Sequence, residues 1–205
     1  DKIIIYDNNE LDGERFEEVI GDYIQSKFVE IINYRGMIAP QQQAYQDCYD
    51  RCNMLYDWIA FFDCDEFLTF VNNQTDIHSF LEQKEFLSYQ VVHVNWKVYG
   101  DNEQLDTDGR NIIERLMKPV EPIDFITKYT TFPENDIVKS IVRGGLSNIR
   151  CDAHTPQSNY YRCCDTTGIP VRLNAYNQPF NFSIAYLRHY STKTIGEWVR
   201  TKMIR

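Results

Sequence analysis

The chain has 205 residues, of which 43% are hydrophobic and 14% aromatic, and its formal net charge is -9. This composition suits one globular domain and excludes an intrinsically disordered chain. The acidic balance argues against broad electrostatic binding to nucleic acid. No stretch reaches the roughly 20 apolar residues that would span a bilayer.

The first third of the chain alternates between strand and helix patterns. Apolar, β-branched runs predict strands at 2–7, 28–34 and 58–62, and apolar residues at helical spacing predict helices at 13–25 and 41–55. The order β-α-β-α-β implies a right-handed, Rossmann-like arrangement with a mainly parallel central sheet. The wholly apolar third run is typical of a strand that is covered on both faces.

The rest of the chain is mixed and predicts a smaller antiparallel part from Tyr89 onward. The expected elements, in chain order, are a helix at 77–83, a strand at 89–99, a polar loop at 101–109, a strand pair at 138–142 and 146–149, and a helix at 194–204. Gly144 and Gly145 join the strand pair. The fold class is therefore α/β.

Most cysteines and two of the histidines are expected to have structural roles. The six cysteines are Cys48, Cys52, Cys64, Cys151, Cys163 and Cys164. Their spacings match no zinc signature and no small disulfide scaffold. We therefore expect reduced, mostly buried thiols, which favours a reducing, cytoplasmic compartment. His93, inside a predicted strand, is expected in the core, and His78 is expected to be an ordinary helix residue.

The most informative segment follows the apolar strand predicted at 58–62. Asp63 and Asp65 come directly after this strand, with Cys64 between them and Glu66 next. Ligands bind at the carboxyl ends of strands in open α/β sheets. Residues two apart in an extended segment point to one side, so both carboxylates can face one ion. A hard divalent cation accepts such oxygens and leaves positions for phosphate oxygens.

The alternative for this segment is a solvated acidic turn after a core strand. An Asp-X-Asp pattern is weak when it stands alone, but three acidic residues within four positions repel one another unless a cation is present. We therefore expect a metal site at Asp63 and Asp65. Asp63 is also expected to lie close to the donor substrate, the molecule that carries the group to be transferred. Mg²⁺ or Mn²⁺ held there would neutralise the developing charge of a nucleoside diphosphate leaving group.

The same segment resembles a known enzyme family. The run at 58–68 reads WIAFFDCDEFL and looks like the hallmark of glycosyltransferase family 92 and the closely related family 2-like transferases. Four further segments fall in the family's order: IYDNN at 5–9 with Asp12, VNWKVYG at 94–100, KSIV at 139–142 with His154, and RHYSTKT at 188–194. The resemblance spans nearly the whole chain. Tyr99 replaces the family's usual Phe, and Thr194 its usual Ser.

The resemblance implies a GT-A glycosyltransferase fold and an enzyme that moves a sugar from a nucleotide-diphosphate sugar to a glycan acceptor. It further implies a UDP-sugar donor, a galactosyl group, an inverting reaction and bacterial surface glycan assembly, with peripheral association at the inner face of the membrane. The family usually begins with a further strand and helix. We therefore expect residues 1–205 to form a single GT-A domain that lacks this first unit.

The resemblance also assigns roles to individual residues. Asp7, Asn9 and Asp12 correspond to the segment that contacts the nucleotide. His189 corresponds to a metal or diphosphate ligand that the C-terminal segment brings to the acidic motif, and Lys193 would pair with the donor phosphates. Because imidazole is a softer ligand than oxygen, a site that contains His189 would suit Mn²⁺ better than Mg²⁺.

The acceptor side and the catalytic base stay open. Trp96 is expected to stack on an acceptor sugar, with core packing as the alternative. His154 has an acceptor-side role or a structural one. An inverting transferase needs a group that takes the proton of the acceptor hydroxyl. The candidates are Asp101 and Glu103, in the loop after Trp96.

Two other functions compete with sugar transfer. Phosphohydrolases of the haloacid dehalogenase type also place Asp-X-Asp after an apolar strand, and Asp101 with Asp106 mimics their later acidic motif. Their fifth motif position is normally Thr or Val, whereas this chain has Phe67. The second alternative is a non-catalytic sugar- or nucleotide-binding module that has kept the fold. The intact carboxylates argue against it.

Overall fold

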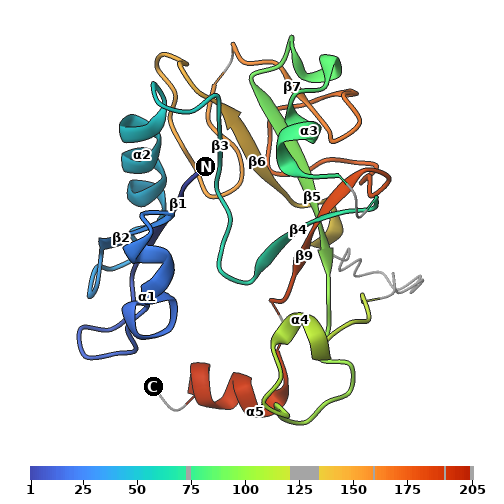
Figure 1. Cartoon of the computed structure of the whole chain (residues 1–205). Helices are drawn as coiled ribbons and strands as arrows, with labels where there is room; N and C mark the ends of the chain where they lie inside the picture. The colour runs from blue at the N-terminus through green and yellow to red at the C-terminus, as the bar shows by residue number, and fades with distance from the viewer. Residues whose placement is uncertain (73–74, 121–133, 159, 192, 204–205) are drawn as a thin grey trace.

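A computed structural model of the chain describes residues 1–72, 75–120, 134–158, 160–191 and 193–203 (Figure 1). The strands in these ranges are β1 (Ile3–Asp7), β2 (Val29–Asn33), β3 (Trp58–Ala60), β4 (Glu66–Phe70), β5 (Val91–Val98), β6 (Val138–Arg143), β7 (Cys163–Cys164), β8 (Pro170–Val171) and β9 (Ala185–His189). The helices are α1 (Glu17–Gln25), α2 (Gln41–Cys52), α3 (Ile77–Leu81), α4 (Ile112–Arg115), α5 (Ile195–Trp198) and the short turns η1 (Lys84–Phe86), η2 (Glu134–Asp136) and η3 (Val199–Met203). The α/β class is confirmed.

The strands form two sheets in the described part of the chain. β1 and β2 make a parallel pair of their own. The larger sheet has the order β3-β6-β5-β7-β8, and β9 joins it beside β5 and carries β4. The pairs β3–β6, β5–β6, β4–β9 and β7–β8 are antiparallel, while β5 runs parallel to β7 and β9.

The expectation of a mainly parallel central sheet is therefore wrong. The reason is that β6 runs antiparallel between β3 and β5, so the chain leaves β5 and re-enters the sheet in β6 from the same end, without a crossover to the other end. The strand expected at 58–62 is present but shorter, because β3 ends at Ala60. Among the described residues, β3 pairs with β6 alone and lies at one end of the strand order.

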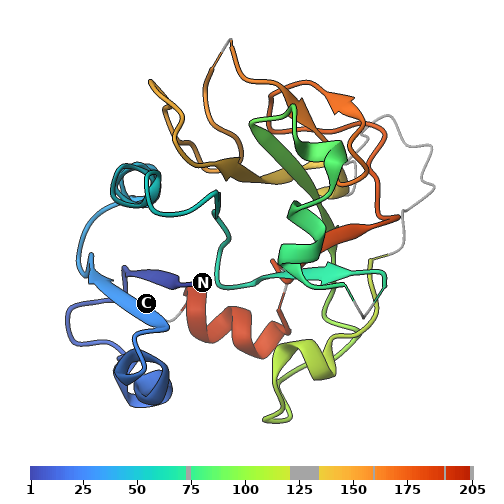
Figure 2. The same ribbon diagram turned by 45° about the horizontal axis from the view of Figure 1, so that its top comes forward.

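Hydrophobic side chains pack on both faces of the larger sheet. Ile141 and Val142, successive residues of β6, point to opposite faces, and each belongs to a different hydrophobic cluster. The cluster beneath α2 contains Tyr49, Cys52, Ile59, Phe61, Val142, Ile149 and Cys151. The cluster beneath α3 and η1 contains Phe80, Phe86, Tyr89, Val92, Val94, Trp96, Ile141, Cys164 and Leu187. Figure 2 shows the β1–β2 pair and α1 on the side of α2, with α5 between this unit and α4.

Two predicted elements differ from the sequence expectation for local reasons. α1 starts at Glu17 instead of residue 13, because the guanidinium group of Arg35 holds the preceding loop by its main-chain carbonyls. Residues 146–149 form no strand. Both edges of β6 are already paired, and Asn148 has a left-handed backbone with φ of 57°.

The remaining expectations concern the C-terminal helix, the thiols and membrane spans. Thr194 and Glu197 form a capping box that starts α5, and residue 204, the expected helix end, lies outside the described residues. All six cysteines are free, and four of them are buried, so the expectation of reduced, mostly buried thiols is confirmed. In the described ranges, no helix has the length and apolar character that crossing a membrane requires.

Candidate active site

The site is built on the acidic turn, residues 63–66. β3 ends at Ala60, the chain continues to the turn, and β4 starts at Glu66. The turn closes on itself: the main-chain amide of Asp63 donates to the Glu66 carboxylate at 2.9 Å, and the amide of Glu66 donates to the Asp63 carbonyl at 3.0 Å. The acidic residues thus follow the strand directly, as the sequence predicts, in a turn of fixed shape.

Three donors hold the carboxylate of Asp63. Gln41, the first residue of α2, and the Tyr45 hydroxyl each donate to Oδ1 at 2.8 Å. Lys139 Nζ lies 2.9 Å from Oδ2. Burial alone would raise the pKa of Asp63, but Lys139 and these hydrogen bonds outweigh burial and hold the pKa below its ordinary value. Asp63 is therefore ionised, and both of its oxygens are engaged by protein donors.

A buried ion pair lies beneath the turn. The side chain of Lys139, in β6, is 1% exposed, and that of Glu66 is 0% exposed. Their charged atoms are 3.7 Å apart, which is close enough for charge attraction but too long for a hydrogen bond. Burial raises the pKa of Glu66 to about 7, although Lys139 opposes the rise. One lysine therefore serves two carboxylates.

Asp65 differs from its neighbours because its half-buried carboxylate has no hydrogen-bond or ion-pair partner in the described part of the chain. The pairing of β4 with β9 sets His189 opposite Glu66, and the Tyr190 amide donates to the Asp65 carbonyl at 3.0 Å. His189 is buried, and its Nδ1 has no partner among the described residues. Burial lowers the pKa of His189, and Asp65 is the strongest charge that opposes this shift.

The indole of Trp96 packs between two imidazoles. The ring centroids of Trp96 and His189 are 3.8 Å apart, and those of Trp96 and His154 are 5.4 Å apart. Trp96 is 7% exposed and belongs to the core beneath α3. Of the two roles that the sequence leaves open, this burial favours core packing over an exposed platform for a sugar. Trp96 holds the imidazole of His189 in place beside the acidic turn.

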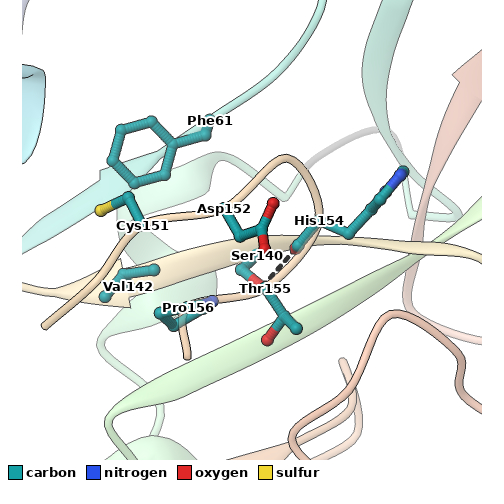
Figure 3. A pocket seen from close by; sticks show the side chains of 8 residues that line it. All are labelled: Phe61, Ser140, Val142, Cys151, Asp152, His154, Thr155 and Pro156. Carbon is teal, nitrogen blue, oxygen red and sulfur yellow. Dashed lines mark hydrogen bonds between the residues drawn. The ribbon is translucent and has the colours of Figure 1, made fainter. Parts of the chain in front are cut away.

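His154 is held by β6 at a small pocket (Figure 3). Its Nδ1 lies 3.1 Å from the Val138 carbonyl oxygen, and the Ser140 hydroxyl donates to its main-chain carbonyl at 2.7 Å. The pocket is lined by Phe61, Ser140, Val142, Cys151, Asp152, His154, Thr155 and Pro156. In Figure 3 the imidazole points away from Cys151 and Pro156. The His154 ring therefore contacts Trp96, which also contacts His189.

The segment after β9 returns to the acidic turn. Burial, Asp63 and Asp65 raise the pKa of the Cys64 thiol, and Lys193 opposes them, so Lys193 lies within electrostatic range of the turn. Thr192, within the RHYSTKT segment, lies outside the described residues. The structure thus brings His189 and Lys193 to the acidic turn from more than 120 positions away in the sequence.

The residues that were predicted to contact the nucleotide lie at the end of β1 and in the loop after it, and they are engaged in part by the protein itself. Asp7 forms a buried ion pair with Arg35 at 2.7 Å, and it also accepts from the Asn9 amide at 3.0 Å. The Asn9 side chain donates to the Glu14 carbonyl at 3.2 Å. Asp12 is exposed. Asp7 therefore shapes this loop, and Asp12 is the carboxylate there that faces solvent.

The candidate bases lie in the loop after β5. This loop starts beside the site, because the Tyr99 amide donates to the His189 carbonyl at 2.9 Å. Asp101 is half-buried and accepts from the Glu103 amide at 3.0 Å, while Glu103 is exposed. In the described structure, neither carboxylate makes a hydrogen bond or an ion pair with the acidic turn.

The fit of these residues to a divalent metal is partial. Within the described ranges, no three His, Cys, Asp or Glu side chains are grouped so that they could hold a metal ion. Asp65 and His189 nevertheless supply a carboxylate without a partner and a buried ring nitrogen without one. A cation at this pair would take its remaining ligands from phosphate oxygens and water, which is how Mg²⁺ and Mn²⁺ are commonly held. The described residues would therefore supply only part of the ligand set of a divalent cation.

The sequence analysis did not identify four further residues of the site. Gln41 and Tyr45 donate to Asp63, and Lys139 pairs with it. Glu134, in η2, opposes the lowering of the His189 pKa and so lies near that ring. One signal was available for Lys139: a lysine that breaks the apolar run of a predicted strand is expected to have a buried acidic partner.

The comparisons with known proteins identify a family for the chain. A search of the curated proteins finds no match to the chain. The model of the family described as Glycosyltransferase family 92 matches residues 1–203 of the 205-residue chain. The match includes the acidic turn, both imidazoles beside Trp96 and the segment that carries Lys193. The chain belongs to glycosyltransferase family 92.

Proposed function

We propose that this glycosyltransferase moves a sugar from a UDP-sugar to a glycan acceptor with a divalent metal bound at the acidic turn. One observation carries the proposal: the partner-free carboxylate of Asp65 lies within electrostatic range of the buried, partner-free Nδ1 of His189. Buried polar atoms are rarely left without a partner unless a ligand, an ion or water supplies one. An oxygen-plus-imidazole donor pair suits Mn²⁺ better than Mg²⁺.

Each residue of the site has a role in this proposal. Asp65 and His189, at the turn that Asp63 anchors, would hold the metal, which supplies charge neutralisation for the diphosphate leaving group. Lys193 pairs with the donor phosphates, and Asp12, with Asp7 and Asn9 behind it, contacts the nucleotide. His154 lines the acceptor side, where Trp96 backs the two imidazoles.

The proton of the acceptor hydroxyl needs a base. Asp101 is the better of the two candidates, because it is half-buried in a loop that starts beside His189, whereas Glu103 is exposed. The base would take the proton of the acceptor hydroxyl, and the acceptor oxygen would attack the anomeric carbon from the face opposite the leaving diphosphate, which gives inversion at the transferred sugar. We propose inversion, a galactosyl group, and a cytoplasmic enzyme at the inner face of a bacterial membrane, all from the family resemblance.

The test is release of UDP from a panel of UDP-sugars, measured with Mn²⁺, with Mg²⁺ and with EDTA, with and without glycan acceptors. We expect release that requires the metal and rises with Mn²⁺ over Mg²⁺. Asp101→Asn should abolish transfer while donor binding survives. A product anomer that retains the donor configuration would overturn the inverting mechanism.

The alternative functions give different results in the same assay. A phosphohydrolase would release inorganic phosphate through an aspartyl-phosphate on Asp63, and the three donors that hold the Asp63 carboxylate argue against that nucleophile. A non-catalytic binding module would bind the nucleotide-sugar and release no UDP. Membership of a glycosyltransferase family favours sugar transfer over both.

A further inference from the structure

Lys139 occupies a position that a lysine rarely takes. It lies in β6, between β3 and β5, and its side chain is 1% exposed. A buried ammonium group costs several kcal/mol unless it is paired with anions and hydrogen-bonded. The surroundings of Lys139 must therefore supply compensating negative charge.

Among the described residues, the compensating groups come from the acidic turn and α2. Lys139 Nζ lies 2.9 Å from Asp63 Oδ2, 3.7 Å from Glu66 Oε1 and 3.4 Å from the Tyr45 hydroxyl oxygen. It also lies 5.6 Å from the centroid of the Tyr45 ring, within the range of a cation–π contact. One fixed cation thus sits where two ionisable carboxylates converge.

These contacts divide the carboxylates of the turn into two kinds. Asp63 is held by Lys139, Gln41 and Tyr45, so its carboxylate has about one lone pair left for an incoming metal ion, which would also meet the repulsion of the ammonium group. Glu66 faces Lys139 and the Asp63 amide from a fully buried position. Asp65 has no such partner among the described residues. The like charge at Lys139 closes one side of the turn to cations and leaves the other open.

We propose that Lys139 is the resident cation of the acidic turn, a positioning residue that holds Asp63 and Glu66 and leaves Asp65 as the carboxylate that takes an incoming metal ion. The proposal rests on the metal-dependent function proposed above and deepens it. Asp63 then shapes the turn and does not ligate the metal directly. Lys139 supplies to Asp63 and Glu66 the positive charge that a metal ion would supply to Asp65.

The first experiment compares two isosteric variants, Asp63→Asn and Asp65→Asn, by the affinity of the whole chain for Mn²⁺ alone. Loss of an outer-shell partner weakens metal binding by about 10–100-fold, so loss of the direct ligand in Asp65→Asn should weaken Mn²⁺ by at least about 100-fold. Asp63→Asn should cost about tenfold at most, the low end for an outer-shell group. Equal losses in the two variants would overturn the division of roles.

The second experiment removes the resident cation. Lys139→Met should lower the melting temperature in EDTA, because Asp63 and Glu66 lose their shared partner. It should also gain affinity for Mn²⁺ by about tenfold, since the repulsion has gone and two carboxylates are freed. The gain corresponds to a Mn²⁺-induced rise in melting temperature that is about 3–6 °C larger than in the wild type. A lysine with only a packing role would give no such gain.

Two further variants keep the test decisive. If Lys139→Met does not fold, the double variant Lys139→Met with Glu66→Gln restores the charge balance of the buried pair, and it should still gain affinity for Mn²⁺ because the repulsion has gone and the Asp63 carboxylate is freed. Lys97→Met is the matched control: Lys97 lies in the neighbouring strand over the rings of Phe182 and Tyr186, and its loss should leave Mn²⁺ affinity unchanged. No gain in either Lys139 variant, or an equal gain in Lys97→Met, overturns the proposal.

The outcomes also separate this inference from the proposed function. A wild type that binds Mn²⁺ but releases no UDP from any donor would end the proposed transfer reaction and leave the role of Lys139 standing. A wild type that takes up no Mn²⁺ would end the metal-dependent mechanism. The Lys139 variants would still decide whether the lysine excludes cations from the turn, because their gain is read in Mn²⁺ binding and melting temperature and not in activity.

Discussion

The loop after β1 and the acidic turn after β3 have similar local sequences, but they differ in whether their aspartates have ion-pair partners. Each has aspartates at or shortly after the end of a short apolar strand: Asp7 is the last residue of β1, and Asp63 and Asp65 follow β3. In the loop, Asp7 is buried in an ion pair with Arg35. In the turn, Asp63 is held by Lys139, but Asp65 has no partner in the described part of the chain. The turn therefore keeps a half-buried carboxylate, Asp65, available for a ligand, whereas the buried Asp7 is committed to Arg35.

The difference depends on whether the fold places a cationic side chain beside the carboxylate. Arg35 reaches Asp7 from 28 positions away, and Lys139 reaches Asp63 from 76 positions away. A carboxylate that receives such a partner becomes part of the framework, and one that does not receive it stays open to an ion or a substrate. The availability of an aspartate therefore depends on tertiary contacts, not on its position after a strand. The predictions below test this comparison.

The largest effect is expected at Arg35. Arg35→Met removes one partner of a buried ion pair, whose side chains are 6% and 3% exposed, and should lower the free energy of unfolding by about 3–5 kcal/mol. Mn²⁺ affinity should not change. Arg51→Met is the control, because the ion pair of Arg51 with Glu30 is exposed and such pairs contribute about 0–1 kcal/mol. Equal destabilisation of the two variants in urea unfolding would contradict the framework role of Asp7.

Asp65→Asn should show the opposite profile. Its melting temperature should stay close to that of the wild type, because no protein group loses a partner. Its kcat/KM for UDP-sugar should fall by at least about 100-fold, which corresponds to about 2.7 kcal/mol. Asp22→Asn, at an exposed position of α1, is the control for the removal of a negative charge. Transfer at the normal rate in Asp65→Asn would remove Asp65 from the active site.

The sequence predicts the strands that are rich in apolar and β-branched residues. β1, β2, β3, β5 and β6 were all expected, because such residues dominate these segments even where a polar residue interrupts them. β4 and β9 were missed, because their buried faces carry Glu66 and His189 and so lack the apolar pattern of a strand. These two polar residues are buried at the site itself. The buried polar residues that made both strands hard to predict are therefore residues of the site.

The site was predictable only as far as local spacing reaches. The position of Asp63 and Asp65 after a strand follows from the sequence, and the family resemblance adds His189. The commitment of Asp63 to Gln41, Tyr45 and Lys139 follows from the packing of α2 and β6 around the turn, which no spacing encodes. The antiparallel pairing of β3 with β6 was not predicted for the same reason, since strand pairing is set by long-range contacts.

A smaller effect is expected at His189, which lies beside the turn and whose Nδ1 has no partner among the described residues. His189→Ala should weaken Mn²⁺ binding by about tenfold, or about 1.4 kcal/mol, and weaken Mg²⁺ less, because imidazole is the softer ligand. Titration calorimetry with each metal measures the ratio. His154→Ala, which removes the other imidazole beside Trp96, is the control and should leave the ratio unchanged. An equal loss for both metals would show that His189 does not ligate.

The smallest effect extends the comparison to a buried group that receives no counter-ion. His93 is fully buried, and its Nε2 lies 3.0 Å from the Thr155 hydroxyl. Burial lowers its pKa to about 4, from an ordinary value of about 6.5 in the unfolded chain. The adjacent Cys163 thiol stays protonated, because burial raises its pKa. The folded state therefore keeps His93 neutral where the unfolded state takes up a proton.

The sign of the pH dependence follows from this difference. Stability from His93 is fully present above pH 6.5 and is lost as the pH falls toward 4, because the unfolded state then binds more protons. Between pH 7.5 and 5.5 the free energy of unfolding should fall by about 1 kcal/mol on account of His93 alone. Urea unfolding of the wild type and of His93→Gln at both values isolates this contribution, since the other titrating groups are shared. A variant that loses as much stability as the wild type over this interval would mean that His93 is protonated in the fold, which requires an anionic partner of the kind that Lys139 and Arg35 have.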